Sequence, residues 1–150
     1  MFLGSHNRTI DSKGRLILPP SFRSRLANGA VMTPLDSCLG ILPAAEFERM
    51  AQKLEAEVSE GSVDINALRS FASEATQVVP DAQGRILLLP RLREIADLEK
   101  TVIVAGAFAR VEVWNTQRWA EIKAAGTEKL AQAITQGRGI GKASIMVDSQ

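Results

Sequence analysis

The sequence contains one thirteen-residue motif twice, and this duplication constrains the fold more than any other feature. Residues 11–23 read DSKGRLILPPSFR and residues 81–93 read DAQGRILLLPRLR, an offset of 70 positions. Six of the thirteen positions are identical, and two more exchange one aliphatic residue for another. A motif that occurs only twice predicts two copies of one structural unit and not a solenoid. The chain is therefore expected to build its fold from two similar halves.

Each copy of the motif predicts a turn, a strand and a short helix, in that order. An aspartate followed three residues later by a glycine is typical of a tight turn, because aspartate bonds to nearby backbone N–H groups and glycine tolerates positive φ. The aliphatic run after the glycine is too short for a helix and predicts a strand. A proline then begins the helix, at a position where its missing N–H costs nothing.

Each predicted turn presents one arginine, Arg15 in the first copy and Arg85 in the second. A guanidinium group on a rigid turn suits bidentate binding to phosphate or guanine, because its donors form a fixed planar fork. The alternative is that each arginine only pairs with the aspartate of its own turn, Asp11 or Asp81, and stabilises that turn. The two interpretations are compatible if the carboxylate orients the arginine.

The net charge of +1 does not by itself indicate a partner, but the charges are unevenly distributed. Residues 1–30 contain five basic residues and one acid, whereas residues 31–78 contain eight acids and three bases. This asymmetry predicts a localised basic face around the first motif. A solvated surface with an ordinary dipole is the alternative explanation.

The segments outside the motifs predict further strands and three longer helices. Strands are expected at 2–10, 30–35, 38–42, 77–79, 101–105 and 109–114, and helices at 44–58, 64–75 and 116–134. The apolar faces of the helices at 44–58 and 64–75 predict packing as a hairpin or a contact in an oligomer. The expected organisation is a first repeat with a helical hairpin at 1–76, a second repeat with a C-terminal helix at 77–135, and a flexible tail at 136–150.

Composition argues against several other classes of protein. No apolar run approaches the roughly 20 residues of a membrane span, and the N-terminus lacks the features of a signal peptide. The single cysteine, Cys38, fits a reducing cytoplasm and is expected to be buried. With no tyrosine, one histidine and no cluster of metal ligands, the sequence predicts no catalytic residues, no cofactor and no metal.

The duplicated Asp-x-x-Gly-Arg motif, with its aliphatic run and proline, resembles the swapped-hairpin DNA-binding family of the AbrB and SpoVT type. Two such units in one chain, the N-terminal residues MFLG and the stretch VEVW at 111–114 resemble the bacterial MraZ family in particular. The resemblance covers about residues 1–125. It implies an α+β fold, a duplicated swapped-hairpin, double-psi-like β-barrel with flanking helices, packed as an intramolecular pseudo-dimer.

The resemblance also implies a function, a sequence-specific DNA-binding transcriptional regulator of the division and cell-wall gene cluster whose first gene encodes it. Such a regulator is expected in the cytoplasm on the nucleoid, as a ring-shaped homo-oligomer that binds double-stranded DNA with GGG-containing direct repeats. Transferred to this sequence, the DNA-binding residues are Asp11, Lys13, Arg15, Asp81 and Arg85. Gln83 stands where the first copy has its lysine, which predicts weaker binding by the second turn.

A protein-interaction module is the alternative function. Antitoxins of the AbrB type bind toxins as well as operators, and the acidic segment 31–78 would then be the partner surface.

For the DNA-binding function, a single turn with two cations is expected to bind DNA weakly, because specific sites usually need about 6–10 phosphate contacts. A ring that presents many such turns would supply them through multivalency.

Overall fold

The computed structural model describes residues 1–138 and contains two compact units, Met1–Asn115 and the segment that begins at Thr116. Residues 139–150, most of the tail predicted from residue 136, lie outside the described residues. The second unit contains one helix, α5 (Thr116–Thr135). The two units are described separately below.

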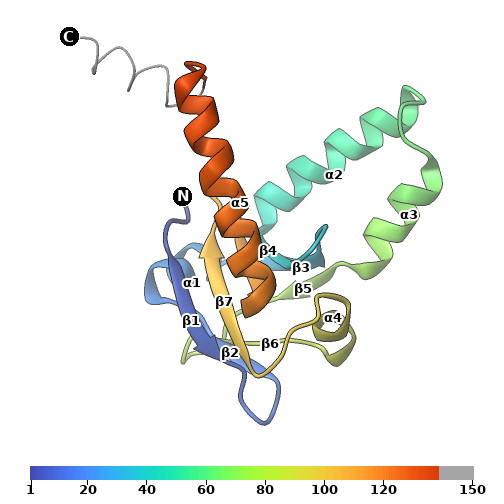
Figure 1. Ribbon diagram of the computed structural model, residues 1–150. Helices are drawn as coiled ribbons and strands as arrows, with labels where there is room; N and C mark the ends of the chain where they lie inside the picture. Colours follow the sequence, from blue (N-terminus) through green and yellow to red (C-terminus); the bar gives the residue numbers. More distant parts are fainter. Residues whose placement is uncertain (139–150) are drawn as a thin grey trace. The chain divides into compact units, whose positions relative to one another are not determined.

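The first unit is an α+β structure that contains every strand and helix predicted before residue 116 (Figure 1). Its elements are β1 (Ser5–Thr9), β2 (Arg15–Ile17), α1 (Pro20–Leu26), β3 (Ala30–Pro34), β4 (Leu39–Pro43), α2 (Ala44–Ser59), α3 (Ile65–Glu74), β5 (Thr76–Val78), β6 (Arg85–Leu87), α4 (Pro90–Ile95), β7 (Thr101–Gly106) and β8 (Val111–Asn115). The largest difference from the prediction is at the N-terminus. There the first strand begins at Ser5, because Gly4 has a φ of 86° that breaks the extended backbone.

The strands form a six-stranded antiparallel sheet, in the order β1-β7-β8-β4-β3-β5, and a two-stranded ribbon of β2 and β6. The first strand of each half pairs with a strand of the other half, β1 with β7 and β5 with β3. The two halves meet again where β4 pairs with β8. Neither half therefore completes its own sheet, and the duplication produces one interlocked unit.

Equivalent residues of the two halves face each other at two points, as they would on a two-fold axis. In the ribbon, Leu16 lies opposite Ile86, and in the large sheet Gly40 lies opposite Glu112. The first pair is 70 residues apart and the second 72. The difference arises because the α4–β7 connection, residues 96–100, is two residues longer than the α1–β3 connection, residues 27–29.

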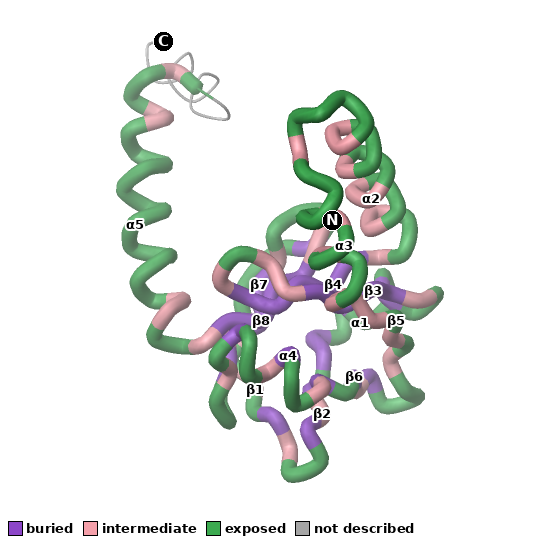
Figure 2. Tube along the Cα trace, turned by 90° about the vertical axis from the view of Figure 1, so that its right-hand side faces the viewer, coloured by how far each residue is buried: buried purple, intermediate pink, exposed green. Residues whose placement is uncertain are grey.

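The hydrophobic core lies where the two halves join. Buried residues gather in the strands (Figure 2), and both halves contribute equally placed side chains. These include the pairs Leu16 and Ile86, Leu18 and Leu88, and Phe22 and Leu92, all at most 2% exposed. Cys38 is buried as expected. Because the core is shared, separating the halves would expose most of it to water.

The helical hairpin of α2 and α3 stands apart from this core. Asp64 caps α3, its Oδ1 accepting a hydrogen bond of 2.7 Å from the backbone N–H of Asn66. Phe47 and Phe71 stack with ring centroids 5.6 Å apart, which confirms the predicted hairpin packing. Neither helix contains a buried residue, so the apolar faces of both remain partly open to solvent (Figure 2).

Candidate nucleic-acid interface

The first turn is organised by the carboxylate of Asp11. Its Oδ1 accepts hydrogen bonds of 2.9 Å from the backbone N–H groups of Lys13 and Arg15, and its Oδ2 accepts one of 2.9 Å from Nε of Arg15. Gly14, with a φ of 80°, closes the turn by donating to the carbonyl of Asp11 at 2.9 Å. One side chain thus fixes both the backbone of the turn and the direction of the arginine.

The second turn repeats this geometry almost atom for atom. Asp81 Oδ1 accepts from the backbone N–H groups of Gln83 at 2.9 Å and Arg85 at 2.8 Å, and its Oδ2 accepts from Arg85 Nε at 2.8 Å. Gly84 has a φ of 78°. The aspartate–arginine pair, which the sequence offered as the alternative role of each arginine, is therefore present in both halves. Repetition of the geometry indicates that the turn is an intrinsic product of the motif.

Both ion pairs leave the outer edge of the guanidinium group available. The aspartate occupies Nε, and neither Nη atom of Arg15 or of Arg85 forms a hydrogen bond with any residue in 1–138. Two parallel donors at the end of an oriented guanidinium group match the acceptors of a guanine edge or a phosphate. The ion pair and an outward-facing binding role are therefore compatible, because they use different nitrogens.

The hydrogen bonds in the turns lower the pKa values of both aspartates below their ordinary value. For Asp11 the largest cause is the backbone N–H of Arg15, and for Asp81 it is the backbone N–H of Arg85. Partial loss of hydration opposes this shift, and the arginine side chains reinforce it. The carboxylates are therefore charged at neutral pH. Their contribution to stability is present above about pH 4 and is lost as the pH falls through the lowered pKa values.

The last arginine of each motif packs over the turn of the other half. Arg23 donates from Nη2 to the carbonyl of Ala82 at 2.7 Å, and a Cβ atom on Gly84 would lie 2.6 Å from its Cδ. Arg93 lies equivalently beside Gly14, with Nη2 3.4 Å from the position of such a Cβ atom. The sequence showed these arginines as identical positions of the repeat, but it gave no indication that each crosses to the opposite turn.

The antiparallel ribbon of β2 and β6 places the two turns at its opposite ends and gives their arginines a common outer face. Leu16 and Ile86 point into the core, so the residues that alternate with them point outward. Arg15 lies opposite Leu87, and Ile17 lies opposite Arg85. Ile17 is 55% exposed and Leu87 50%. The face therefore combines two arginines with two exposed aliphatic side chains.

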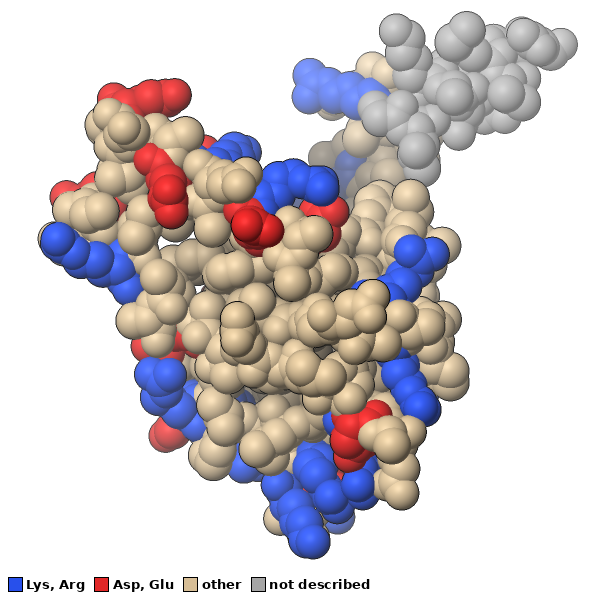
Figure 3. All heavy atoms as spheres, turned by 180° about the vertical axis from the view of Figure 1, so that it is seen from behind, with Lys and Arg blue, Asp and Glu red and all other residues tan. Residues whose placement is uncertain are grey.

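The charge distribution agrees with this position of the turns. In Figure 3 basic side chains gather at the end of the first unit that carries the turns, and acidic side chains lie over the α2–α3 hairpin. Lys13 is exposed at the tip of the first turn, where its side chain forms no hydrogen bond with residues 1–138. Gln83 occupies the same place in the second turn. All five predicted residues thus lie at or beside the ribbon, and the two turns differ in charge.

Across 1–138, histidine, cysteine, aspartate and glutamate side chains form no group of three or more that could hold a metal ion. No helix in this range has the length and apolar character to span a membrane.

The fold and the turns define a class of protein with two interlocked half-domains, each presenting an arginine on an aspartate-ordered turn. A family model described as "MraZ protein, putative antitoxin-like" matches residues 1–66 and 71–136, one match for each half. The chain belongs to the MraZ family, as its resemblance to that family predicted.

Curated relatives match the chain over most of its length. It is 44% identical over 135 residues to the transcriptional regulator MraZ of Saccharopolyspora erythraea, covering 89% of this chain and 94% of the relative. The protein of the same name from Cutibacterium acnes is 40% identical over 136 residues, covering 87% and 93%. That of Mycolicibacterium gilvum is 38% identical over 141 residues, covering 93% and 98%. These names describe regulators and not enzymes, and they agree with the predicted class, a transcriptional regulator.

Proposed function

We propose that the chain is a sequence-specific DNA-binding transcriptional regulator that acts on the promoter of the division and cell-wall gene cluster and regulates its own expression. It would work in the cytoplasm, on the nucleoid. The observation that carries the proposal is the β2–β6 ribbon, which presents two oriented arginines on one outer face. A two-stranded ribbon is narrow enough to enter the major groove of DNA.

The ribbon offers a distinct contact for each kind of DNA group. The free Nη atoms of Arg15 and Arg85 would donate to O6 and N7 of guanine, which fits an operator with GGG-containing direct repeats. Lys13 would bind a backbone phosphate, and Asp11 and Asp81 would act through the arginines that they orient. The exposed Ile17 would meet the methyl group of a thymine.

The exchange of strands between the halves supports the finer assignment of the fold as a duplicated swapped-hairpin barrel of the AbrB and SpoVT type. The first repeat with its hairpin would be residues 1–76, and the second repeat with its helix residues 77–135. The pairing of β1 with β7 and of β5 with β3 is the observation behind this assignment. Both repeats contribute a turn to one ribbon, so we propose that they bind DNA as a pair.

We propose that copies of the chain assemble through the α2–α3 hairpin into a ring. The hairpin has a groove of about 130 Å³ between its helices, lined chiefly by apolar side chains that include Leu54, Leu68 and Phe71. A half-exposed apolar face of this kind fits a second apolar surface. A ring of like-oriented subunits would prefer direct repeats to a palindrome, and it would add many weak contacts into one stable complex.

The function is tested by the binding of purified protein to a duplex from the region upstream of its own gene. We expect binding to fall steeply with salt and to exceed binding to a shuffled duplex of equal length. Lys13→Ala is expected to weaken binding to both duplexes alike and to reduce the salt slope by about 1 for each engaged subunit. Lys129→Ala, at an exposed position of α5, is the matched loss of charge and should change neither. Equal affinity of the wild-type protein for both duplexes would contradict the proposal.

The assembly is tested by Leu54→Asp, which places a charge in the apolar groove of the hairpin. We expect native mass spectrometry to show smaller species than for the wild-type protein and DNA affinity to fall at least tenfold. Gln52→Asp, at an exposed position of α2 outside the groove, should leave the assembly intact. A circular dichroism spectrum would show whether the hairpin itself remains helical. A wild-type protein that is monomeric at micromolar concentration would overturn the ring.

An antitoxin-like interaction module remains the second candidate, favoured by the acidic surface of the hairpin and by the description of the family model. A pull-down from the native cell distinguishes the two functions. A stoichiometric protein partner, together with no retention on DNA at low salt, would favour the interaction module. Retention on DNA without such a partner would favour the regulator.

A further inference from the structure

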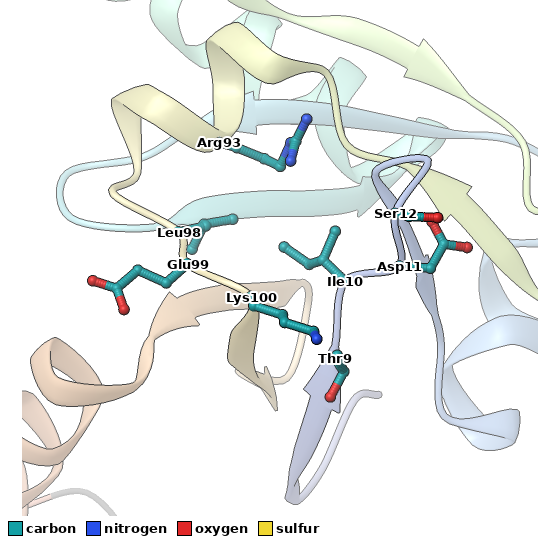
Figure 4. Close-up of a pocket in the computed structure, with 8 residues that line it drawn as sticks. All are labelled: Thr9, Ile10, Asp11, Ser12, Arg93, Leu98, Glu99 and Lys100. Atoms are coloured by element: carbon teal, nitrogen blue, oxygen red, sulfur yellow. The ribbon is translucent and has the colours of Figure 1, made fainter.

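A groove of about 510 Å³ lies beside the first turn, between that turn and the α4–β7 connection (Figure 4). Residues from the end of β1 and the turn form one wall, and Arg93 and residues 98–100 form the other. The proposed DNA contacts of the ribbon do not use this groove. Its lining contains two cationic side chains, Arg93 and Lys100, and two hydroxyl groups, those of Thr9 and Ser12.

One wall of the groove belongs to the longer connection of the second half, residues 96–100. The carbonyl of Lys100, the last residue of this connection, accepts a hydrogen bond of 2.8 Å from the N–H of Ile10 at the base of the first turn. In the other half the residue equivalent to Ile10 is Pro80, which has no N–H to donate. The shorter α1–β3 connection therefore cannot form the same wall around the second turn.

The polar lining is also specific to the first turn. Thr9 and Ser12 correspond to Val79 and Ala82 at the offset of 70, and Lys100 corresponds to Asn28 at the offset of 72. Arginine is present in both halves, as Arg23 and Arg93. The second turn therefore lacks both hydroxyl groups and the lysine that the first turn has in its groove.

Two acidic residues also line the groove, but neither cancels its cations. The oxygens of Asp11 already accept three hydrogen bonds, including one from Arg15. The side chain of Glu99 points away from the other lining residues (Figure 4). Arg93 and Lys100 both extend toward the space between the walls, and the ammonium group of Lys100 reaches toward Thr9. Among residues 1–138 the ammonium group of Lys100 forms no hydrogen bond or ion pair.

We propose that this groove is a phosphate-binding site. Arg93 and Lys100 supply positive charge from one wall. The hydroxyl groups of Thr9 and Ser12 on the other wall are turned outward in Figure 4 and would donate to a bound phosphate oxyanion after rotation about χ1. The phosphate is either a backbone group of bound DNA, which rests on the proposed function, or a free phosphate ion, which does not. If the groove binds DNA, the first turn binds it more strongly than the second. The two turns are then not equivalent, so the two-fold pseudo-symmetry of the unit does not require a palindromic operator.

The test uses the full chain and converts the groove to its counterpart in the other half. Lys100→Asn and Ser12→Ala install the equivalent residues, and Lys129→Asn, at an exposed position of α5, is the control for the loss of one charge. In the first arm, fluorescence anisotropy measures affinity for a promoter duplex and for a shuffled duplex over a range of salt. In the second arm, inorganic phosphate is added without DNA, and amide chemical shifts are followed at Thr9, Ser12 and Lys100.

If the source is backbone phosphate, Lys100→Asn weakens binding to both duplexes and lowers the salt slope by about 1 for each engaged subunit, whereas Lys129→Asn does not. If the source is free phosphate, DNA binding is unchanged, but phosphate shifts the wild-type amides and not those of Lys100→Asn. A Lys100→Asn protein that matches the wild type in both arms overturns the inference. If the wild-type protein binds no DNA, the proposed function fails. The titration with inorganic phosphate then tests by itself whether the groove binds phosphate.

Discussion

Arg15→Ala is expected to remove the sequence preference of the protein while leaving its general attraction to DNA largely in place. Arg15 presents two free Nη donors in a fixed orientation, and a bidentate contact with guanine discriminates by about 1–3 kcal/mol. An assembly that uses several copies of this contact multiplies the effect. We therefore expect the ratio of affinities for promoter and shuffled duplexes to fall at least about 100-fold, measured by anisotropy at constant salt.

Two further variants separate the effect of the planar guanidinium group from the effect of its charge and of its position. Arg15→Lys retains the charge but loses the planar fork, so it should lose preference almost as fully and keep more of the general affinity. Arg49→Ala removes an exposed arginine that pairs with Glu46 at 3.1 Å on α2 and should change neither quantity. Thermal melting shows that each variant is folded. If a folded Arg15→Ala protein keeps the wild-type ratio of affinities for the promoter and shuffled duplexes, Arg15 has no role in sequence recognition.

Gly106→Ala is expected to be among the most destabilising substitutions in the first unit. A Cβ atom at this position would lie 2.4 Å from the carbonyl carbon of Phe2 and 2.5 Å from the backbone nitrogen of Leu3. These are backbone atoms, so the N-terminal segment as a whole would have to move. That movement breaks the hydrogen bonds of 2.8 and 3.1 Å that join Phe2 and Phe108 and withdraws Phe2, 2% exposed, from the core.

We expect Gly106→Ala to cost about 3 kcal/mol and to lower the melting temperature by about 10 °C. Gly126→Ala is the control, because a Cβ atom there meets nothing within 4 Å and the residue lies within α5. It should not destabilise the protein, since alanine favours helix more than glycine does. Amide hydrogen exchange should also be faster in β1 of Gly106→Ala. Equal melting temperatures for the two variants would show that the N-terminal segment is not packed on Gly106.

Much of this structure follows from the repeated motif. The identical aspartate, glycine and arginine were sufficient to predict the turn and to suggest its ion pair as an alternative role of the arginine, because all three act within five residues of the chain. The proline likewise predicted the start of each short helix. The positions of the predicted strands and helices agree with the structure because each depends on local spacing and on glycine or proline at its ends.

Features that depend on contacts across the halves could not be predicted in this way. The sequence gives no local sign that β1 pairs with β7, or that Arg23 packs over the turn at Gly84. Glu112 alternates with valines as an exposed residue would. It is nevertheless buried on the pseudo-axis, where it accepts hydrogen bonds from Arg110 at 2.8 Å and Trp114 at 3.0 Å. The groove beside Lys100 is lined by a connection that is two residues longer than its counterpart, a difference that is visible only when the two halves are compared.

The pairing of β1 with β7 has a consequence for synthesis of the protein on the ribosome. The first strand to leave the exit tunnel has its sheet partner at Thr101–Gly106, and β2 has its partner at Arg85–Leu87. A nascent chain that ends after α3 would hold unpaired edges and an unfinished core, and contacts so distant in sequence form slowly. Folding of the first unit is therefore expected to be post-translational or nearly so, and nascent chains stalled before β7 should be sensitive to protease.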